Sequence, residues 1–158
     1  MTNVPSARAR GPFAGLLARA FAAMAAIPDW PIALVARLSI AGVFWQSGRT
    51  KVEGFAVTDT AIALFQDEYK LPLISPWLGA HLAAFAEHLF PVLLVIGFAT
   101  RLSALALLTM TLVIQTFVYP GAWPTHGVWA ACLLFLMARG AGLLSVDALI
   151  ERRTSSWT

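Results

Sequence analysis

The chain alternates between long apolar segments and short polar connections. Four segments are long and apolar enough to cross a bilayer, which takes about 20 helical residues: residues 31–47, 78–98, 103–119 and 125–144. The last three are joined by the short connections 99–102 and 120–124. Because short connections make consecutive helices antiparallel neighbours, the pattern predicts an all-α membrane protein built as a four-transmembrane-helix up-down bundle.

Two further helices are predicted outside these spans. Residues 13–27 have apolar side chains at helical spacing, which favours an amphipathic helix at the membrane interface within the N-terminal segment 1–30. A signal peptide is the alternative, because residues 22–26 (AAMAA) offer small side chains near a cleavage site. The connection 48–77 is too long to lack structure of its own. Within it, residues 58–69 have one apolar face and predict a short helix in the first outer loop.

The composition supports a membrane protein and excludes several other classes. Of 158 residues, 59% are hydrophobic and 12% are charged, against roughly 25% charged in a soluble domain. The mean hydropathy is +0.74. The net charge of +3 does not indicate nucleic acid, because the arginines are scattered at segment ends without forming a basic stripe. The single cysteine, Cys132, excludes an intramolecular disulfide. The lipid bilayer is therefore the expected surrounding.

The distribution of lysine and arginine predicts an orientation. Four spans place both termini, including the tail 151–158, on the side of the 99–102 connection. That side carries seven basic residues: Arg8, Arg10, Arg19, Arg101, Arg139, Arg152 and Arg153. The opposite side carries three: Arg49, Lys51 and Lys70. Since basic residues concentrate on the cytoplasmic side, we expect a multi-pass protein of the bacterial inner membrane with both termini in the cytoplasm.

Two charged side chains interrupt the apolar spans, Arg37 in the first and Glu87 in the second. A central charge costs about 2.5–3.5 kcal/mol to insert and needs a partner or water. Arg37 lies roughly 9 Å and Glu87 roughly 16 Å from the cytoplasmic end, a difference that a guanidinium can bridge. We therefore predict that Arg37 pairs with Glu87, and that His88 completes a buried polar cluster. Such a cluster either fixes helix packing or lines a quinone or proton pocket.

Several softer polar residues are candidate ligands for a metal ion or haem, or proton relays. They are His81, His88, His126 and Met110. His81 and His88 share one helical face, but they lie about 10 Å apart along the axis, too far for one ion unless other spans fill the gap. Packed histidines are therefore favoured over metal or haem ligation. The sequence has no nucleophile elbow, phosphate loop or zinc motif, so no catalytic residue is assigned and no independent enzyme is expected.

Three short motifs, taken in order, resemble the DoxX family. Residues 37–51 place an arginine before a glycine-containing helix and Gly-x-x-Lys, and residues 87–101 place a mid-helix acid before a glycine and Thr-Arg. Residues 140–147 read GAGLLSVD. The resemblance covers about residues 31–150 and implies a four-helix membrane domain. Carried over by position, the signature polar residues are Arg37, Lys51, Glu87, Arg101 and Asp147.

The resemblance implies a redox setting, since named DoxX members include a subunit of thiosulfate:quinone oxidoreductase. The first hypothesis is an accessory subunit of a quinone- or sulfur-linked membrane redox system, in which Glu87 accepts a proton, Arg37 keeps it ionised and His88 relays. The second is a non-enzymatic module that handles a metal or assembles a partner, because related members accompany gene sets for metal-binding peptides. A small transporter ranks third, since no internal repeat is visible. A protein partner or a homo-oligomer is expected.

Overall fold

The computed structural model describes residues 12–155. The α-helices are α1 (Pro12–Ala25), α2 (Asp29–Arg49), α3 (Asp59–Leu64), α4 (Pro76–Ile96), α5 (Thr100–Val113), α6 (Trp123–Arg139) and α7 (Val146–Ser155). Strands β1 (Val52–Glu53) and β2 (Ala56–Val57) form an antiparallel hairpin. The π-helices η1 (Phe65–Tyr69) and η2 (Ile114–Val118) continue α3 and α5, and the 3₁₀ turn η3 (Pro120–Ala122) precedes α6. Arg8 and Arg10, which entered the orientation count, lie outside the described residues.

The predicted helical segments are all helical, with one boundary corrected. Thr58 caps α3 by accepting a hydrogen bond from Ala61 N at 3.2 Å, and α3 with η1 forms the predicted loop helix. The fourth segment was predicted to continue to residue 144, which is wrong: α6 ends at Arg139 and the chain leaves the helix at Gly140, with φ at +81°. The predicted C-terminal tail begins inside α7.

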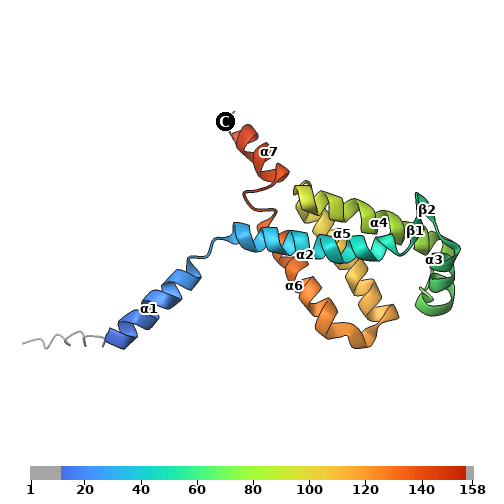
Figure 1. The fold of residues 1–158 in the computed structure, drawn as a ribbon, viewed down its shortest axis with the longest axis horizontal. Helices are drawn as coiled ribbons and strands as arrows, with labels where there is room; N and C mark the ends of the chain where they lie inside the picture. The colour runs from blue at the N-terminus through green and yellow to red at the C-terminus, as the bar shows by residue number, and fades with distance from the viewer. Residues whose placement is uncertain (1–11, 156–158) are drawn as a thin grey trace, which may run out of the picture.

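Four helices form the body of the molecule. α2 packs against α4 and α6, and α5 packs against the same two helices (Figure 1). Small side chains such as Ala33 and Ala36 on α2 and Ala84 on α4 are buried between the helices, where they permit close approach of the backbones. Larger side chains, including Ile40 of α2, complete the core. The hairpin and α3 extend this body beyond the end of α2 and cover α4 there.

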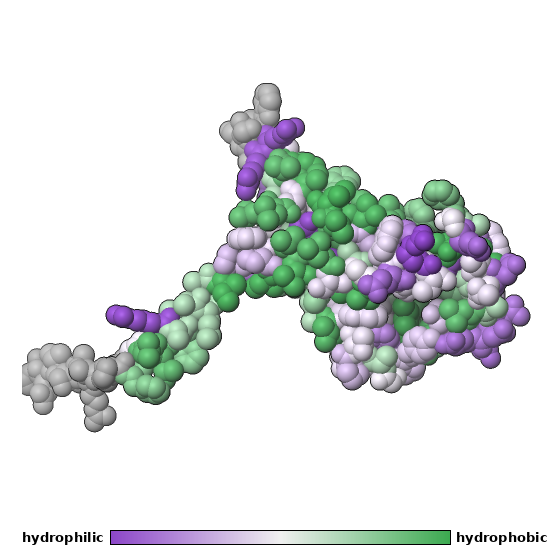
Figure 2. Space-filling model, in the orientation of Figure 1, coloured by the Kyte–Doolittle hydropathy of each residue, from purple (hydrophilic) through white to green (hydrophobic). Residues whose placement is uncertain are grey.

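The outer surface of the body is also apolar. Val35 and Phe85 are among many large hydrophobic side chains that are more than half exposed. Figure 2 shows apolar side chains over the middle of the molecule, and polar ones gathered over the hairpin and α3 and on α7. A soluble monomer does not expose so much contiguous apolar surface. A surface of this kind requires lipid or a partner.

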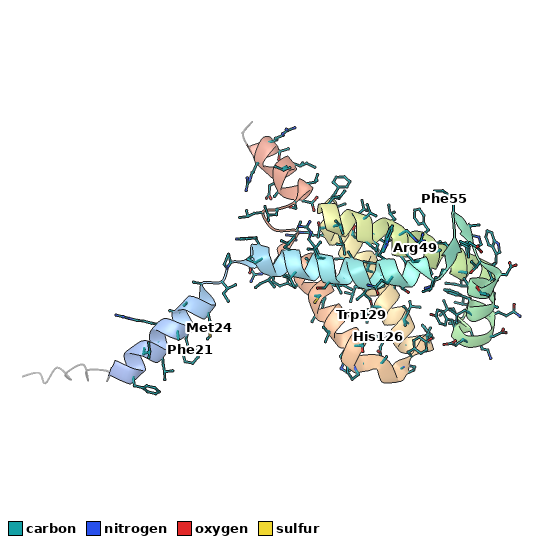
Figure 3. All side chains as sticks on the ribbon, viewed as in Figure 1. Phe21, Met24, Arg49, Phe55, His126 and Trp129 are labelled. Carbon is teal, nitrogen blue, oxygen red and sulfur yellow. The ribbon has the colours of Figure 1, made fainter. Side chains whose placement is uncertain are left out.

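Three helical segments are long and apolar enough to cross a membrane: Pro76–Ile96, Thr100–Val118 and Pro120–Arg139. A fourth span exists if α1 and α2, which meet at a 55° bend, are counted as one. Among residues 12–155 the protein is thus an all-α membrane protein with three or four candidate spans. α1 extends away from the body, and its Phe21 and Met24 are exposed (Figure 3). Its position at the membrane interface stays a prediction.

Candidate functional site

Arg37 is fully buried and binds backbone, not a carboxylate. Its Nε donates to Leu94 O at 2.6 Å and its Nη2 to Val95 O at 2.7 Å. Its Nη1 donates to Ala141 O and Leu144 O, both at 2.8 Å. The last carbonyls of a helix have no partner within the helix. Arg37 therefore satisfies the C-terminal end of α4 and fixes the 140–145 loop against it.

Asp147 completes this structure from the other side of the loop. Its two carboxylate oxygens accept hydrogen bonds from Ala99 N at 2.8 Å and Thr100 N at 2.9 Å, at the start of α5. Its own backbone N donates to Gly97 O at 2.9 Å. An acid at a helix N-terminus satisfies free N–H groups and complements the helix dipole. Arg37 and Asp147 thus hold the α4–α5 turn and the 140–147 loop together, a unit that we call the Arg37 cluster.

Gly97 is needed at the centre of the Arg37 cluster, and Gly97→Ala is expected to lower the free energy of unfolding by at least about 2 kcal/mol. The residue has φ at +69°, and an added Cβ would lie 2.5 Å from Ser145 Cβ and 2.8 Å from Arg37 Nη2. Thermal unfolding in mild detergent measures the loss. Gly54→Ala is the control, because Gly54 has φ at +60° with open space around it. Equal losses in the two variants would contradict the close packing at Gly97.

The predicted pairing of Arg37 with Glu87 is wrong. Arg37 lies level with Leu94 and Val95, seven and eight residues beyond Glu87 on α4, which corresponds to about 10–12 Å along the helix axis. The guanidinium meets the end carbonyls of α4 before it can reach the carboxylate. Arg37, Glu87 and His88 therefore do not form one polar cluster.

Lys51 is the partner of Glu87. Its Nζ donates to Glu87 Oε2 at 2.8 Å, and both side chains are buried. The other acceptors of the ammonium are Ser47 Oγ at 3.0 Å and Ser47 O at 3.2 Å, so its three donors are all used. Gly48 permits this approach, because an added Cβ would lie 3.0 Å from Glu87 Cβ and 2.9 Å from the His88 ring. The pair is held where α2 ends against the middle of α4.

Glu87 also lines an apolar pocket of about 420 Å³, which we call the Glu87 pocket. Its walls come from α4 and α5, with Met110 on the α5 side, and it is bounded by Phe65 and Tyr69 of η1 and by Ser47 of α2. Apart from Ser47, Tyr69, Glu87 and Thr109, the lining side chains are apolar. A mainly apolar cavity with a few placed polar groups is the usual form of a small-molecule site.

Both π-helices of the described residues line the Glu87 pocket, η1 through Phe65 and Tyr69 and η2 through Ile114 and Val118. π-helical turns are rare and are frequently found at functional sites. Beside the pocket, the Tyr69 and Tyr119 rings meet edge to face with centroids 5.9 Å apart. The Tyr119 hydroxyl donates to Glu68, and this hydrogen bond raises the pKa of Tyr119. The contacts hold η1 against the end of α5.

The three histidines occupy different environments. His81 and His88 face a second cavity, on another side of α4 from the Glu87 pocket. His126 is buried, with Nδ1 2.7 Å from Gln115 Oε1. Within the described residues no group of three or more His, Cys, Asp or Glu side chains is arranged to hold a metal ion. The candidate ligands thus do not converge, and nothing here favours the metal-handling hypothesis.

Comparison with known proteins identifies the family. The DoxX family model matches residues 32–120. The chain belongs to the DoxX family. It is also 32% identical over 136 residues to an uncharacterized protein of Haemophilus influenzae, across 78% of this chain and 87% of the relative. No solved structure matches it.

The DoxX signature residues divide between two places in the structure. Arg37 and Asp147 build the Arg37 cluster, whereas Lys51 and Glu87 form the buried ion pair at the Glu87 pocket. Arg101 is exposed at the start of α5 and lines a cavity of about 610 Å³ beside the 140–147 loop. Sequence reasoning selected these residues but paired them incorrectly. The Gly48-x-x-Lys51 spacing was the available signal, since it returns Lys51 to the end of α2.

Proposed function

We propose that this DoxX protein is a membrane subunit of a redox system that binds a lipid-soluble quinone or quinol in the Glu87 pocket. The observation that carries the proposal is the buried Glu87 carboxylate, held by Lys51, in the wall of an otherwise apolar cavity. An isoprenoid quinone has a compact polar ring on an apolar tail. A mainly apolar pocket with one acceptor suits such a molecule, because its few polar groups fix the orientation of the ligand.

The chemistry assigned to Glu87 is acceptance of a hydrogen bond, and then of a proton, from a quinol hydroxyl. A carboxylate is acceptor-only when ionised, and the Lys51 ammonium 2.8 Å away supports that ionised form. Oxidation of a quinol releases two protons and two electrons. This chain takes a proton at Glu87, and the electrons pass to a redox cofactor of a partner subunit. The role is therefore accessory and not that of an independent enzyme.

The same proposal places the protein in the bacterial inner membrane with both termini in the cytoplasm. In this arrangement α2, α4, α5 with η2, and α6 are the four spans of an up-down bundle. The Arg37 cluster, Arg101 and Arg139 lie toward the cytoplasmic ends, while Arg49, Lys51 and Lys70 lie toward the other side. This distribution supports the orientation because basic residues concentrate on the cytoplasmic side.

Quinone content after purification tests the proposal. The wild-type protein, isolated in mild detergent, is expected to carry extractable isoprenoid quinone near one per chain. Glu87→Gln is expected to lower this content about tenfold or more, since a hydrogen bond to a charged group contributes about 1.5–3 kcal/mol. Ala106→Phe, which fills the pocket from α5, is expected to have the same effect.

The matched control is Glu53→Gln, because Glu53 is exposed on the hairpin away from the pocket. It should retain the wild-type quinone content. A wild-type protein that is empty and takes up no added ubiquinone or menaquinone in nanodiscs would contradict the proposal. So would equal content in all four proteins, which would mean that the quinone dissolves in the detergent and does not occupy the pocket.

A further inference from the structure

A second cavity lies on another side of α4, between this helix, Trp45 of α2 and the β1–β2 hairpin. It encloses about 630 Å³, and we call it the histidine groove. Its polar ring nitrogens come from His81 and His88, and most other lining side chains are apolar. Glu87 and His88 are adjacent in sequence, which turns them about 100° apart on a helix. The groove and the Glu87 pocket are therefore separate.

Hydrogen bonds fix the same tautomer on both imidazoles. His81 Nδ1 lies 2.8 Å from Trp77 O, and His88 Nδ1 lies 2.6 Å from Ala84 O. A carbonyl oxygen only accepts, so Nδ1 carries the proton in each ring. In a neutral imidazole the other nitrogen, Nε2, is then an acceptor. The groove thus presents two hydrogen-bond acceptors from one helix face.

The distance between these acceptors follows from their shared geometry. Each ring bonds the carbonyl four residues before it, so the two side chains are related by the helical repeat over seven residues. That repeat is a translation of about 10.5 Å with nearly no rotation. One metal ion cannot be bound by both, because Zn–N bonds are about 2.0–2.1 Å. Two hydrogen bonds of about 2.8 Å leave about 5 Å between two donor oxygens.

A spacing of this size matches the two hydroxyl groups at opposite ends of one six-membered ring. The walls suit such a ring. The Trp45 ring meets the His88 ring at 5.1 Å between centroids, and the Trp77 ring stacks on His81 at 4.0 Å. Phe55, at the tip of the hairpin, borders the groove and is 109% exposed relative to the reference state (Figure 3). Aromatic side chains therefore stand ready on both sides of the hairpin edge.

We propose that the histidine groove binds a para-hydroquinone, with one hydroxyl donating to His81 Nε2 and the other to His88 Nε2. The oxidised quinone has carbonyls that only accept and cannot make these bonds with neutral imidazoles. The groove therefore selects the reduced form. This site goes beyond the proposed function, because it uses neither Glu87 nor Lys51 and requires no electron transfer.

Nitrogen NMR of the histidines tests the proposal in nanodiscs. The chain has only three histidines, so ¹⁵N-histidine labelling with a tag free of histidine gives three assignable rings. The free protein is expected to show the Nδ1–H tautomer at His81 and His88. Added tetramethylhydroquinone, kept reduced, is expected to shift both Nε2 resonances in a saturable way. His126, bound to Gln115, is the internal reference and should not shift.

Variants and the oxidised probe separate the outcomes. His81→Phe and His88→Phe should each weaken binding about fivefold, since each removes one hydrogen bond. Tetramethylbenzoquinone should leave the wild-type resonances unchanged. Glu87→Gln should bind the hydroquinone as the wild type does even if it loses extractable quinone, so the two sites fail independently. A Nε2–H tautomer at either ring, or equal shifts with both probes, would overturn the proposal without relying on any variant.

Discussion

Replacement of Arg37 by methionine is expected to lower the free energy of unfolding by about 3–5 kcal/mol. The change removes four hydrogen bonds, two to the last turn of α4 and two to the 140–145 loop. Val95 O, Ala141 O and Leu144 O would then lose the partner that Arg37 supplies. Unfolding in mixed micelles, followed by circular dichroism, measures the loss.

Two controls show whether the geometry or the charge of Arg37 matters. Arg37→Lys keeps the charge but lacks the planar fork that reaches four carbonyls, so an intermediate loss is expected. Arg49→Met removes an exposed arginine from the end of the same helix and should cost little. Limited proteolysis adds a local readout, because the 140–145 loop should become cleavable in Arg37→Met. A loss equal to that of Arg49→Met would mean that the hydrogen bonds of Arg37 contribute nothing measurable.

The helices could be predicted from the sequence because their signals are local. Apolar segments of sufficient length, the Thr58 cap and short connections are visible in a stretch of one helix. The seven-residue spacing likewise placed His81 and His88 on one face, and the structure confirms that they share a groove. The end of α6 was missed since the 140–144 segment is apolar enough to continue a span, while the Arg37 cluster holds it as a loop.

The partners of the buried charges could not be predicted in the same way. We matched Arg37 to Glu87 by depth and by sign of charge, but Arg37 is neutralised by no carboxylate in contact with it and binds carbonyls instead. Backbone acceptors at a helix end are present in every sequence and give no signal. Lys51 reaches Glu87 only because the chain turns back directly after α2. The π-helices are also invisible in the sequence, since they reflect a shift in backbone hydrogen bonds.

The corrected pairing makes a second prediction of large effect, a double-mutant cycle on Lys51 and Glu87. Lys51→Met and Glu87→Met are each expected to lower the free energy of unfolding by about 3–5 kcal/mol, because each leaves a buried charge without its partner. The double variant should lose less than either single variant, since both charges are then gone. The same mixed-micelle unfolding measures all three.

The control cycle combines Arg37→Met with Glu87→Met. These residues share no hydrogen bond or ion pair in the described structure, so their losses should add to within about 0.5 kcal/mol. Coupling in that cycle, with additive losses at Lys51 and Glu87, would restore the pairing predicted from the sequence and refute the one seen here. Coupling at Lys51 and Glu87 alone also decides how the quinone test is interpreted. Glu87→Gln leaves Lys51 unpaired, so Lys51→Met with Glu87→Gln is the variant in which the carboxylate is removed without an uncompensated ammonium beside the pocket.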